Sequence, residues 1–345
     1  MQTVDLYARN VVVRVSTVLN ELLARKQVLN SAFGLTCYYF SQVHVVSNPT
    51  SETGAFDHGQ YFSFLRTRNI GDVIVHSRKL KSTSDFLSEN LELFPLGTVC
   101  VCDEQLAGRG RGENVWQSPL GSLAFSFTCA TKLSASDIPL MQYVSTLAVV
   151  KAIEDACYEA GCMDYAGLGI RIKWPNDIYY KTTKVKSVLC RAIYQEASFR
   201  TIVGIGLNLN NAVRSPTVCL SGIVREKEHM FRKDEEVHPL FMRERLIPRI
   251  LEHFELVHES IETVGFCAVR DEYLKYWLHS GTCLSVLDAS GSDASVTVVG
   301  LTDAGLLLAG EVNEISIGEG DEKFELHPDS NSLDLLSGMV RKKVH

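Results

Sequence analysis

Residues 108–116 read Gly-Arg-Gly-Arg-Gly-Glu-Asn-Val-Trp, and residues 173–177 read Lys-Trp-Pro-Asn-Asp. The alternating glycines of the first stretch let backbone N–H groups approach an anion, while Arg109 and Arg111 add bidentate donors suited to phosphate or carboxylate. Their spacing matches neither a dinucleotide fingerprint nor a P-loop. In the second stretch, a proline-containing turn holds a lysine, an amide and a carboxylate. The two stretches predict a site for a nucleotide triphosphate and a small carboxylic acid.

The composition excludes some classes of partner. The chain has 345 residues, a formal net charge of −7 and a hydrophobic share of 46%. These values are ordinary for a soluble globular protein, and the acidic balance argues against a nucleic-acid surface, which needs an excess of basic residues. No apolar run approaches the ~20 residues of a membrane span. We therefore expect no DNA partner, no membrane partner, and a monomer or a weak homodimer.

The ten cysteines are scattered along the chain and lack the spacing of a zinc site or a disulfide framework. Cys100, Cys129, Cys190 and Cys219 lie in apolar surroundings in the sequence. They are expected to be small buried hydrophobic residues in a reducing compartment. The expected location is the cytoplasm.

Residues 1–27 allow two interpretations. Their apolar residues recur with helical spacing, which favours an ordinary first helix. The alternative is an organelle transit peptide, which is typically rich in arginine and poor in acids. Four basic residues support the alternative and two acidic residues count against it: Arg9, Arg14, Arg25 and Lys26, against Asp5 and Glu21.

The rest of the chain predicts an α+β fold. We divide it into an N-terminal extension (1–72), a catalytic domain (73–270) and a C-terminal domain (271–345). Strands are expected near residues 72–75, 98–102, 123–127, 168–173, 178–180, 185–194 and 201–209. Helices are expected at residues 84–90, with Ser84 or Asp85 as the cap, from about 137 to 160, and over most of 237–279. Short alternating strands over 281–327 suggest a small SH3-type β-barrel.

Several motifs occur in a specific order along the chain. Ser-Thr follows the first strand, glutamine precedes the Gly-Arg-Gly-Arg stretch, then come residues 173–177, a lysine, and Gly-x-Gly-x-Asn at 204–208. This order resembles the biotin–protein ligases over residues 73–340, with the closest match to the catalytic region of the eukaryotic holocarboxylase synthetase type. The resemblance implies a catalytic domain like that of class II aminoacyl-tRNA synthetases, a mixed sheet with flanking helices, and a small C-terminal SH3-like β-barrel.

The resemblance also implies roles for individual residues. Those expected to bind biotin are Ser82, Thr83, Ser84, Gln105, Arg109, Gly110, Arg111, Lys184 and Gly206. Those expected to bind ATP are Arg109, Arg111, Trp116, Lys173, Asn176 and Asn208. Those expected to hold Mg²⁺ are Asp177 and Asn208. The expected catalytic residues are Arg111, Lys184 and Asp177.

The implied reaction has two steps. Biotin's carboxylate attacks the α-phosphorus of ATP and releases pyrophosphate, while Arg109, Arg111, Lys184 and Mg²⁺ stabilise the developing charge. A lysine on the biotin carboxyl-carrier domain of a carboxylase then attacks the acyl carbon of biotinyl-5′-AMP. Asp177 or the phosphate is a candidate to accept the amine's proton.

One departure from the family pattern follows the ligand lysine. The family usually has a pair of small residues there, whereas this chain has Lys186 and Ser187. Because alternate strand residues face opposite sides, Lys186 is expected to point outward and Ser187 toward the ligand. The assignment of the ligand lysine to Lys184 rather than Lys186 stays open.

Three other functions are weighed against a biotin–protein ligase. A lipoate or octanoate ligase shares the fold, but the Gly-Arg-Gly-Arg stretch and the C-terminal barrel favour biotin. A biotin-responsive DNA-binding repressor needs a helix-turn-helix, and residues 28–72 show no three-helix pattern. A pseudoenzyme that binds the adenylate without transferring it is supported only by Lys186 and Ser187.

Overall fold

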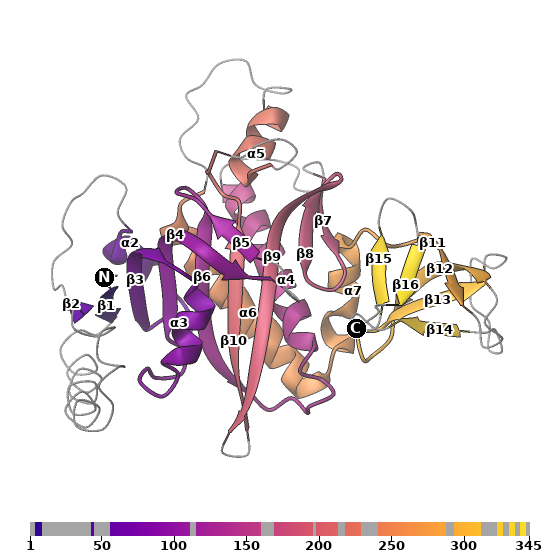
Figure 1. The fold of residues 1–345 in the computed structure, drawn as a ribbon, viewed down its shortest axis with the longest axis horizontal. Coiled ribbons are helices and arrows are strands. Elements are labelled where there is room, and N and C mark those ends of the chain that lie inside the picture. Colours follow the sequence, from indigo (N-terminus) through magenta and orange to yellow (C-terminus); the bar gives the residue numbers. More distant parts are fainter. Residues whose placement is uncertain are drawn as a thin grey trace.

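The chain folds around one large mixed sheet (Figure 1). The computed structural model describes residues 4–8, 43–44, 56–110, 115–159, 169–195, 198–212, 218–228, 241–287, 293–311, 323–326, 331–334 and 339–342. Within these ranges, ten strands form the large sheet and six form a second sheet.

The strands of the large sheet lie in the order β2-β1-β3-β4-β6-β10-β9-β8-β7, with β5 paired to β4. The pairs β1–β2 and β3–β4 are parallel, and the other pairs are antiparallel. The strands are β1 (Val4–Ala8), β2 (Val43–His44), β3 (Val73–Leu80), β4 (Val99–Arg109), β5 (Val115–Ser118), β6 (Leu123–Thr131), β7 (Ile170–Lys173), β8 (Asp177–Tyr180), β9 (Thr183–Gln195) and β10 (Ser198–Leu207).

Two long helices cover one face of this sheet, and a short helix lies on the other. The long helices, α4 (Leu140–Glu159) and α6 (Arg243–Val264), pack against each other and against the main core. Phe127 of β6 meets Phe254 of α6 at a ring-centroid distance of 4.7 Å. The remaining helices are α2 (His58–Phe64), which packs on α6, α5 (Leu220–Glu228) and α7 (Cys267–Tyr276).

A smaller core lies under α3 (Thr83–Glu89) on the opposite face. Phe86 and Leu87 of this helix pack there against apolar side chains of the sheet, among them Ala124 and Ile202. Burial of large apolar side chains such as Phe86 and Leu87 contributes about 1.5–3 kcal/mol each. These contacts hold the start of α3 against β6 and β10, where the polar side chains described below converge.

The C-terminal part forms the second sheet, in the order β14-β13-β12-β11-β16-β15. In Figure 1 it lies at the end of the molecule opposite β1 and β2. The segment between α7 and this sheet pairs with β7, where the Leu278 N–H donates to the Ile172 carbonyl at 3.0 Å. The strands of the second sheet are β11 (Cys283–Leu287), β12 (Asp293–Leu301), β13 (Leu307–Glu311), β14 (Lys323–Leu326), β15 (Asn331–Asp334) and β16 (Met339–Lys342).

Several sequence-based expectations need correction. Residues 4–8 form a strand where helical spacing predicted a helix, because they pair with β3. Ser82, rather than Ser84 or Asp85, caps α3. Cys100 and Cys129 are buried as expected, but Cys190 and Cys219 are only half-buried. None of the described helices is long and apolar enough to cross a membrane.

Candidate functional site

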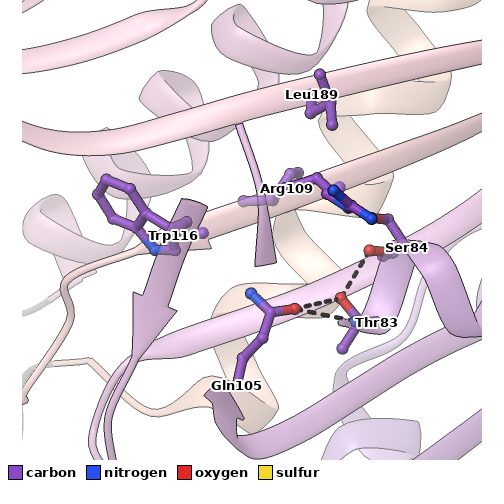
Figure 2. Close-up of a pocket in the computed structure, with 10 residues that line it drawn as sticks. Thr83, Ser84, Gln105, Arg109, Trp116 and Leu189 are labelled. Atoms are coloured by element: carbon purple, nitrogen blue, oxygen red, sulfur yellow. Dashed lines mark hydrogen bonds between the residues drawn. The ribbon is translucent and has the colours of Figure 1, made fainter. Parts of the chain in front are cut away.

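A pocket lies between α3 and the face of the large sheet that α3 covers (Figure 2). It encloses about 330 Å³ of empty space, including the part that is open to solvent. The lining residues are Thr83, Ser84, Gln105, Arg109, Trp116, Ser126, Leu189, Gly204, Ile205 and Gly206. The structure thus brings together six of the residues predicted to bind substrate.

One end of the pocket is polar and buried. The Thr83 N–H and hydroxyl both donate to the Gln105 side-chain oxygen, at 2.9 and 3.2 Å, and the two side chains are turned toward each other in Figure 2. The Thr83 hydroxyl also lies 2.8 Å from that of Ser126. Since a buried polar group costs stability without partners, this mutual bonding orients donors and acceptors before a ligand arrives.

Ser82 and Ser84 stand beside this polar end. The Ser82 Oγ accepts from the Asp85 N–H at 3.1 Å and lies 3.1 Å from the Ser84 Oγ. Ser82 therefore caps α3, and it is absent from the described pocket lining. Its role in the structure is to fix the helix start that carries Thr83 and Ser84.

The Trp116 ring packs directly on the backbone of Gly206, because position 206 has no side chain. A Cβ at Gly206 would lie 2.8 Å from the Trp116 Nε1, well inside van der Waals contact. A Cβ at Gly204 would meet the Ser126 Oγ at 3.3 Å. The paired glycines in β10 therefore allow a close approach of side chains from neighbouring elements.

Arg109 is the cation at the pocket. Its Nε donates to Asp85 at 3.2 Å, and its side chain is about half exposed. The other carboxylate oxygen of Asp85 accepts from Arg191 at 2.8 Å. Burial disfavours the charged carboxylate, but hydrogen bonds from Arg191 and Arg109 outweigh this and hold the pKa of Asp85 below its usual range.

An ion pair between Lys184 and Asp177 lies next to Trp116. The Lys184 ammonium is 2.7 Å from the Asp177 Oδ2 and 5.9 Å from the centroid of the indole ring. The Asp177 Oδ1 is buried and has no hydrogen-bond partner in the part of the chain that the structure describes. Burial raises the pKa of Tyr179, and the negative charge of Asp177 raises it further. An unsatisfied carboxylate oxygen of this kind is a ready ligand for a hard cation.

The turn at residues 173–177 contains a cis peptide bond before Pro175 and is held by distant parts of the chain. The Trp174 N–H donates to His279 Nε2 at 2.9 Å, and its indole N–H donates to the Gly305 carbonyl at 3.1 Å. Tyr273 donates to the Pro175 carbonyl at 2.9 Å. Burial, aided by the positive charge of Lys173, lowers the pKa of His279 to about 4, so it is a neutral acceptor at pH 7.

Three residues predicted to bind ATP lie outside the described pocket lining. Lys173 places its ammonium 5.5 Å from the centroid of the Tyr179 ring. The buried Asn176 amide donates to the Val188 carbonyl. Asn208 is also buried, and its side-chain oxygen accepts from Asn211 at 3.2 Å. The two asparagines therefore already have partners within the fold.

Some predicted positions fall outside the described part of the chain. Arg111 lies in the undescribed segment 111–114, and Gly110 is the last described residue after β4. The side chains of Lys186 and Ser187 are also outside it, although their backbone pairing is defined. Ser187 is opposite both Gly206 and Asp177. Of the two candidates for the ligand lysine, Lys184 and Lys186, only Lys184 has a described side chain. It lies beside Trp116.

Four pocket residues were not among the predicted ligand residues: Gly204, which belongs to the Gly-x-Gly-x-Asn stretch, and three others, Ser126, Leu189 and Ile205. Ser126 had a usable signal, since it is a polar residue in the alternating strand β6 and yet is fully buried. The other two are ordinary apolar strand residues, which nothing in the sequence distinguishes from core.

The geometry defines what ligand the pocket suits. The lining offers hydroxyls and an amide, the apolar side chains of Leu189 and Ile205, two glycines, and the cation of an arginine. A molecule with a hydrogen-bonding ring, an apolar chain and an anionic group matches these features. The Lys184–Asp177 pair adds a further cation and a carboxylate oxygen next to the pocket tryptophan.

Comparison with known proteins agrees with this geometry. The sequence profile of the Biotin/lipoate A/B protein ligase family matches residues 76–208. Biotin--protein ligase 2 of Arabidopsis thaliana is 35% identical over 312 residues, which span 88% of each chain. Biotin--protein ligase 1, chloroplastic, of the same plant is 35% identical over 296 residues, or 85% of this chain and 75% of that protein.

A solved structure supports the fold. The biotin protein ligase from Aquifex aeolicus in complex with biotin and ATP superposes with a TM-score of 0.53 at 24% identity, over 73% of this chain and 94% of that one. With the relatives above, these matches show that the chain belongs to the biotin/lipoate protein ligase family. Within that family, it is similar to biotin–protein ligases along most of its length.

Proposed function

We propose that this protein is a biotin–protein ligase, which activates biotin with ATP and transfers it to a lysine of a carboxyl-carrier protein. The observation that carries the proposal is the pocket, in which a polar end built on Thr83 and Gln105 and the cation of Arg109 line a single cavity. Identity of 35% to biotin–protein ligases over 88% of the chain supports the same function.

The pocket residues have distinct parts in the first step. Thr83, Gln105 and Ser126 bind the ring of biotin through hydrogen bonds, and the apolar residues contact its chain. Arg109 then meets the carboxylate, which attacks the α-phosphorus of ATP as pyrophosphate leaves. Lys184 stabilises the charge on the phosphate oxygens in the transition state, where a fixed cation in a partly buried site is most effective.

In the second step, the lysine amine of the carrier domain attacks the acyl carbon of biotinyl-5′-AMP, and AMP leaves. The attacking amine loses a proton, which Asp177 is proposed to accept, because its Oδ1 has no hydrogen-bond partner among the described residues. Because water would hydrolyse the mixed anhydride, a closed pocket protects it. The undescribed segment that contains Arg111 follows β4. Arg111 is proposed to be the second cation of the pocket, after Arg109.

Asp177 fits the role of a magnesium ligand, because one of its oxygens is buried and lacks a partner among the described residues. Asn208 fits less well, since its oxygen already accepts from Asn211. Bound Mg²⁺ usually keeps several waters and takes one or two carboxylates plus substrate phosphates, so a single protein carboxylate suffices. When bound, the ion would neutralise charge on the ATP phosphates.

Five further expectations from the sequence remain predictions. They are the SH3-like form of the C-terminal sheet, the domain limits at 72 and 270, the carboxylase carrier domains as acceptors, a monomer or weak homodimer without a DNA partner, and a cytoplasmic location. The acidic net charge of −7 supports the absence of DNA.

The deciding experiment is exchange of labelled pyrophosphate into ATP by the purified chain, supplied with biotin, lipoate or octanoate in parallel. Exchange that depends on biotin alone is the expected result. Exchange with lipoate or octanoate instead would assign the chain to the other branch of its family. Binding of biotin and ATP without exchange would support the pseudoenzyme.

A further inference from the structure

Asp85 joins two arginines at the pocket. One of its oxygens accepts from Arg109 at 3.2 Å, and the other accepts from Arg191 at 2.8 Å. The Asp85 side chain is only 17% exposed, whereas that of Arg109 is 52% exposed. The carboxylate is therefore the inner member of the group, and Arg109 is its most exposed member, since the Arg191 side chain is 33% exposed.

The sheet register places Arg191 on the pocket face. Arg191 follows Leu189 by two residues in β9, so the two side chains lie on the same face of the strand. Leu189 lines the pocket. Arg191 is opposite Ile202 of β10, which is buried against α3. From this position the guanidinium reaches the first turn of α3, where Asp85 lies.

The three charges do not cancel. Two arginines share one carboxylate, whose pKa is held below its usual range, so the group has a net charge of +1 near neutral pH. Among the described residues that line the pocket, Arg109 is the only charged one. The neighbouring pair of Lys184 and Asp177 is neutral as a unit. The excess positive charge is therefore available at Arg109.

We propose that Arg191 is a positioning residue for the substrate's carboxylate: by neutralising Asp85, it leaves the charge of Arg109 free to bind the anionic end of biotin. This inference rests on the proposed function. With Arg191 present, Asp85 divides its charge between the two arginines. Without Arg191, Arg109 is the one remaining partner of Asp85 in this group, so a substrate carboxylate must compete with the full charge of Asp85 for Arg109. Arg191 acts only through Asp85, because it is not part of the described pocket lining.

The charge argument separates charged ligands from neutral ones. Biotinol, in which an alcohol replaces the carboxylate, occupies the same ring and chain contacts without needing the charge of Arg109. Removal of Arg191 should therefore weaken biotin and spare biotinol. Removal of Asp85 at the same time should restore biotin, because Arg109 then has no competing partner.

The experiment uses the full chain and measures the dissociation constants of biotin and biotinol by calorimetry, with the KM of biotin in pyrophosphate exchange. For Arg191→Gln we expect roughly a tenfold weaker Kd and higher KM for biotin, the size expected for a partly screened charge at close range. The Kd of biotinol and the kcat at saturating biotin should change less than about twofold on the same argument. Arg191→Lys, which keeps the charge, should retain most of the affinity.

The double variant Asp85→Asn/Arg191→Gln should bind biotin within about threefold of the unaltered protein, since the competing charge is gone. Arg200→Gln is the matched control. Arg200 lies on the next strand, pairs with Glu92 at 3.6 Å and is not part of the described pocket lining. Its loss should leave both ligands unaffected.

Equal weakening of biotin and biotinol in Arg191→Gln, or a double variant as weak as the single one, would overturn the inference, since either shows general damage to the pocket. An unchanged biotin Kd in Arg191→Gln would overturn it too. If the unaltered protein binds no biotin and supports no exchange with it, the proposed function fails, and the inference fails with it.

Discussion

The pocket and the turn at residues 173–177 are both rich in hydrogen bonds, but their partners come from different parts of the chain. In the pocket, Thr83 bonds to Gln105 and Ser126, all within the segment that the family profile matches. The turn is instead held by His279, Tyr273 and Gly305, which lie about 100 or more residues further along. Substrate recognition and the geometry of the turn should therefore respond to different substitutions.

The largest expected effect is at Lys184, which contacts both regions through Asp177 and Trp116. Lys184→Met keeps the length of the side chain and removes its charge. We expect a loss of about 100- to 1,000-fold in the rate of biotin-dependent pyrophosphate exchange, the usual cost of removing one transition-state donor.

Lys181→Met is the control for Lys184→Met, because Lys181 lies in the same hairpin and pairs on the surface with Glu226 at 3.2 Å. It should retain nearly full activity. Full activity of Lys184→Met would contradict the assignment and favour Lys186 as the functional lysine.

Acid should weaken the turn before the pocket. The pKa of His279 is lowered to about 4 in the fold, against about 6.5 when unfolded. Its stabilising contribution is therefore complete above pH 6.5 and is lost as the pH falls toward 4, by at most about 3 kcal/mol. Denaturant titrations from pH 7 to 4 should show a smaller fall in the free energy of unfolding for His279→Gln than for the unaltered protein.

His58 provides the comparison for this pH effect. Burial is the main cause that lowers its pKa to about 3, so its contribution also decreases below pH 6.5. The unfolding free energy of His279→Gln should therefore still fall with acid, with a shallower slope. Identical slopes for the two proteins would show that His279 is not held neutral by the fold.

A matched pair of truncations should separate the two regions. Gln105→Ala removes the acceptor of two Thr83 bonds and should raise the KM of biotin about tenfold, with that of ATP nearly unchanged. His279→Ala leaves the Trp174 N–H without its partner and should raise the KM of ATP by a similar factor while sparing the Kd of biotin. Steady-state kinetics with each substrate varied in turn tests the split. If either substitution raised the KM of biotin and the KM of ATP by the same factor, the pocket and the turn would not act independently.

The smallest effect expected is at the glycine beneath the indole. Gly206→Ala places a Cβ 2.8 Å from the Trp116 Nε1, so the ring must shift by several tenths of an ångström. We expect biotin to bind about fivefold more weakly, as for a modest overpacking of about 1 kcal/mol. In Gly300→Ala the added Cβ meets nothing within 4 Å, and biotin binding should not change.

Much of the fold could be predicted from periodicity. The hairpin β8–β9, strand β10 and helix α4 lie within a few residues of where alternation and helical spacing place them. The strand at residues 4–8 could not be predicted, because its pairing with β3 overrides a helical pattern.

In the candidate site, residues that belong to motifs could be predicted, whereas contacts between distant residues could not. Thr83, Gln105, Arg109 and Trp116 belong to motifs and were predicted, and the structure gathers them in one pocket. The contact of Arg191 with Asp85 joins residues 106 positions apart, and no local signal marks it. No local signal marks the support of the turn by His279 either, because it depends on how the segment before the C-terminal sheet pairs with β7.

The position of Trp116 gives the protein a built-in optical probe. The chain has three tryptophans, of which Trp174 and Trp277 are buried near the junction with the C-terminal sheet, while Trp116 lies half-buried on the pocket. Ligand binding should alter the emission of the pocket indole alone. Opening of the junction should shift the other two toward the red as they meet water. One fluorescence spectrum can therefore report filling of the pocket and loosening of the junction separately.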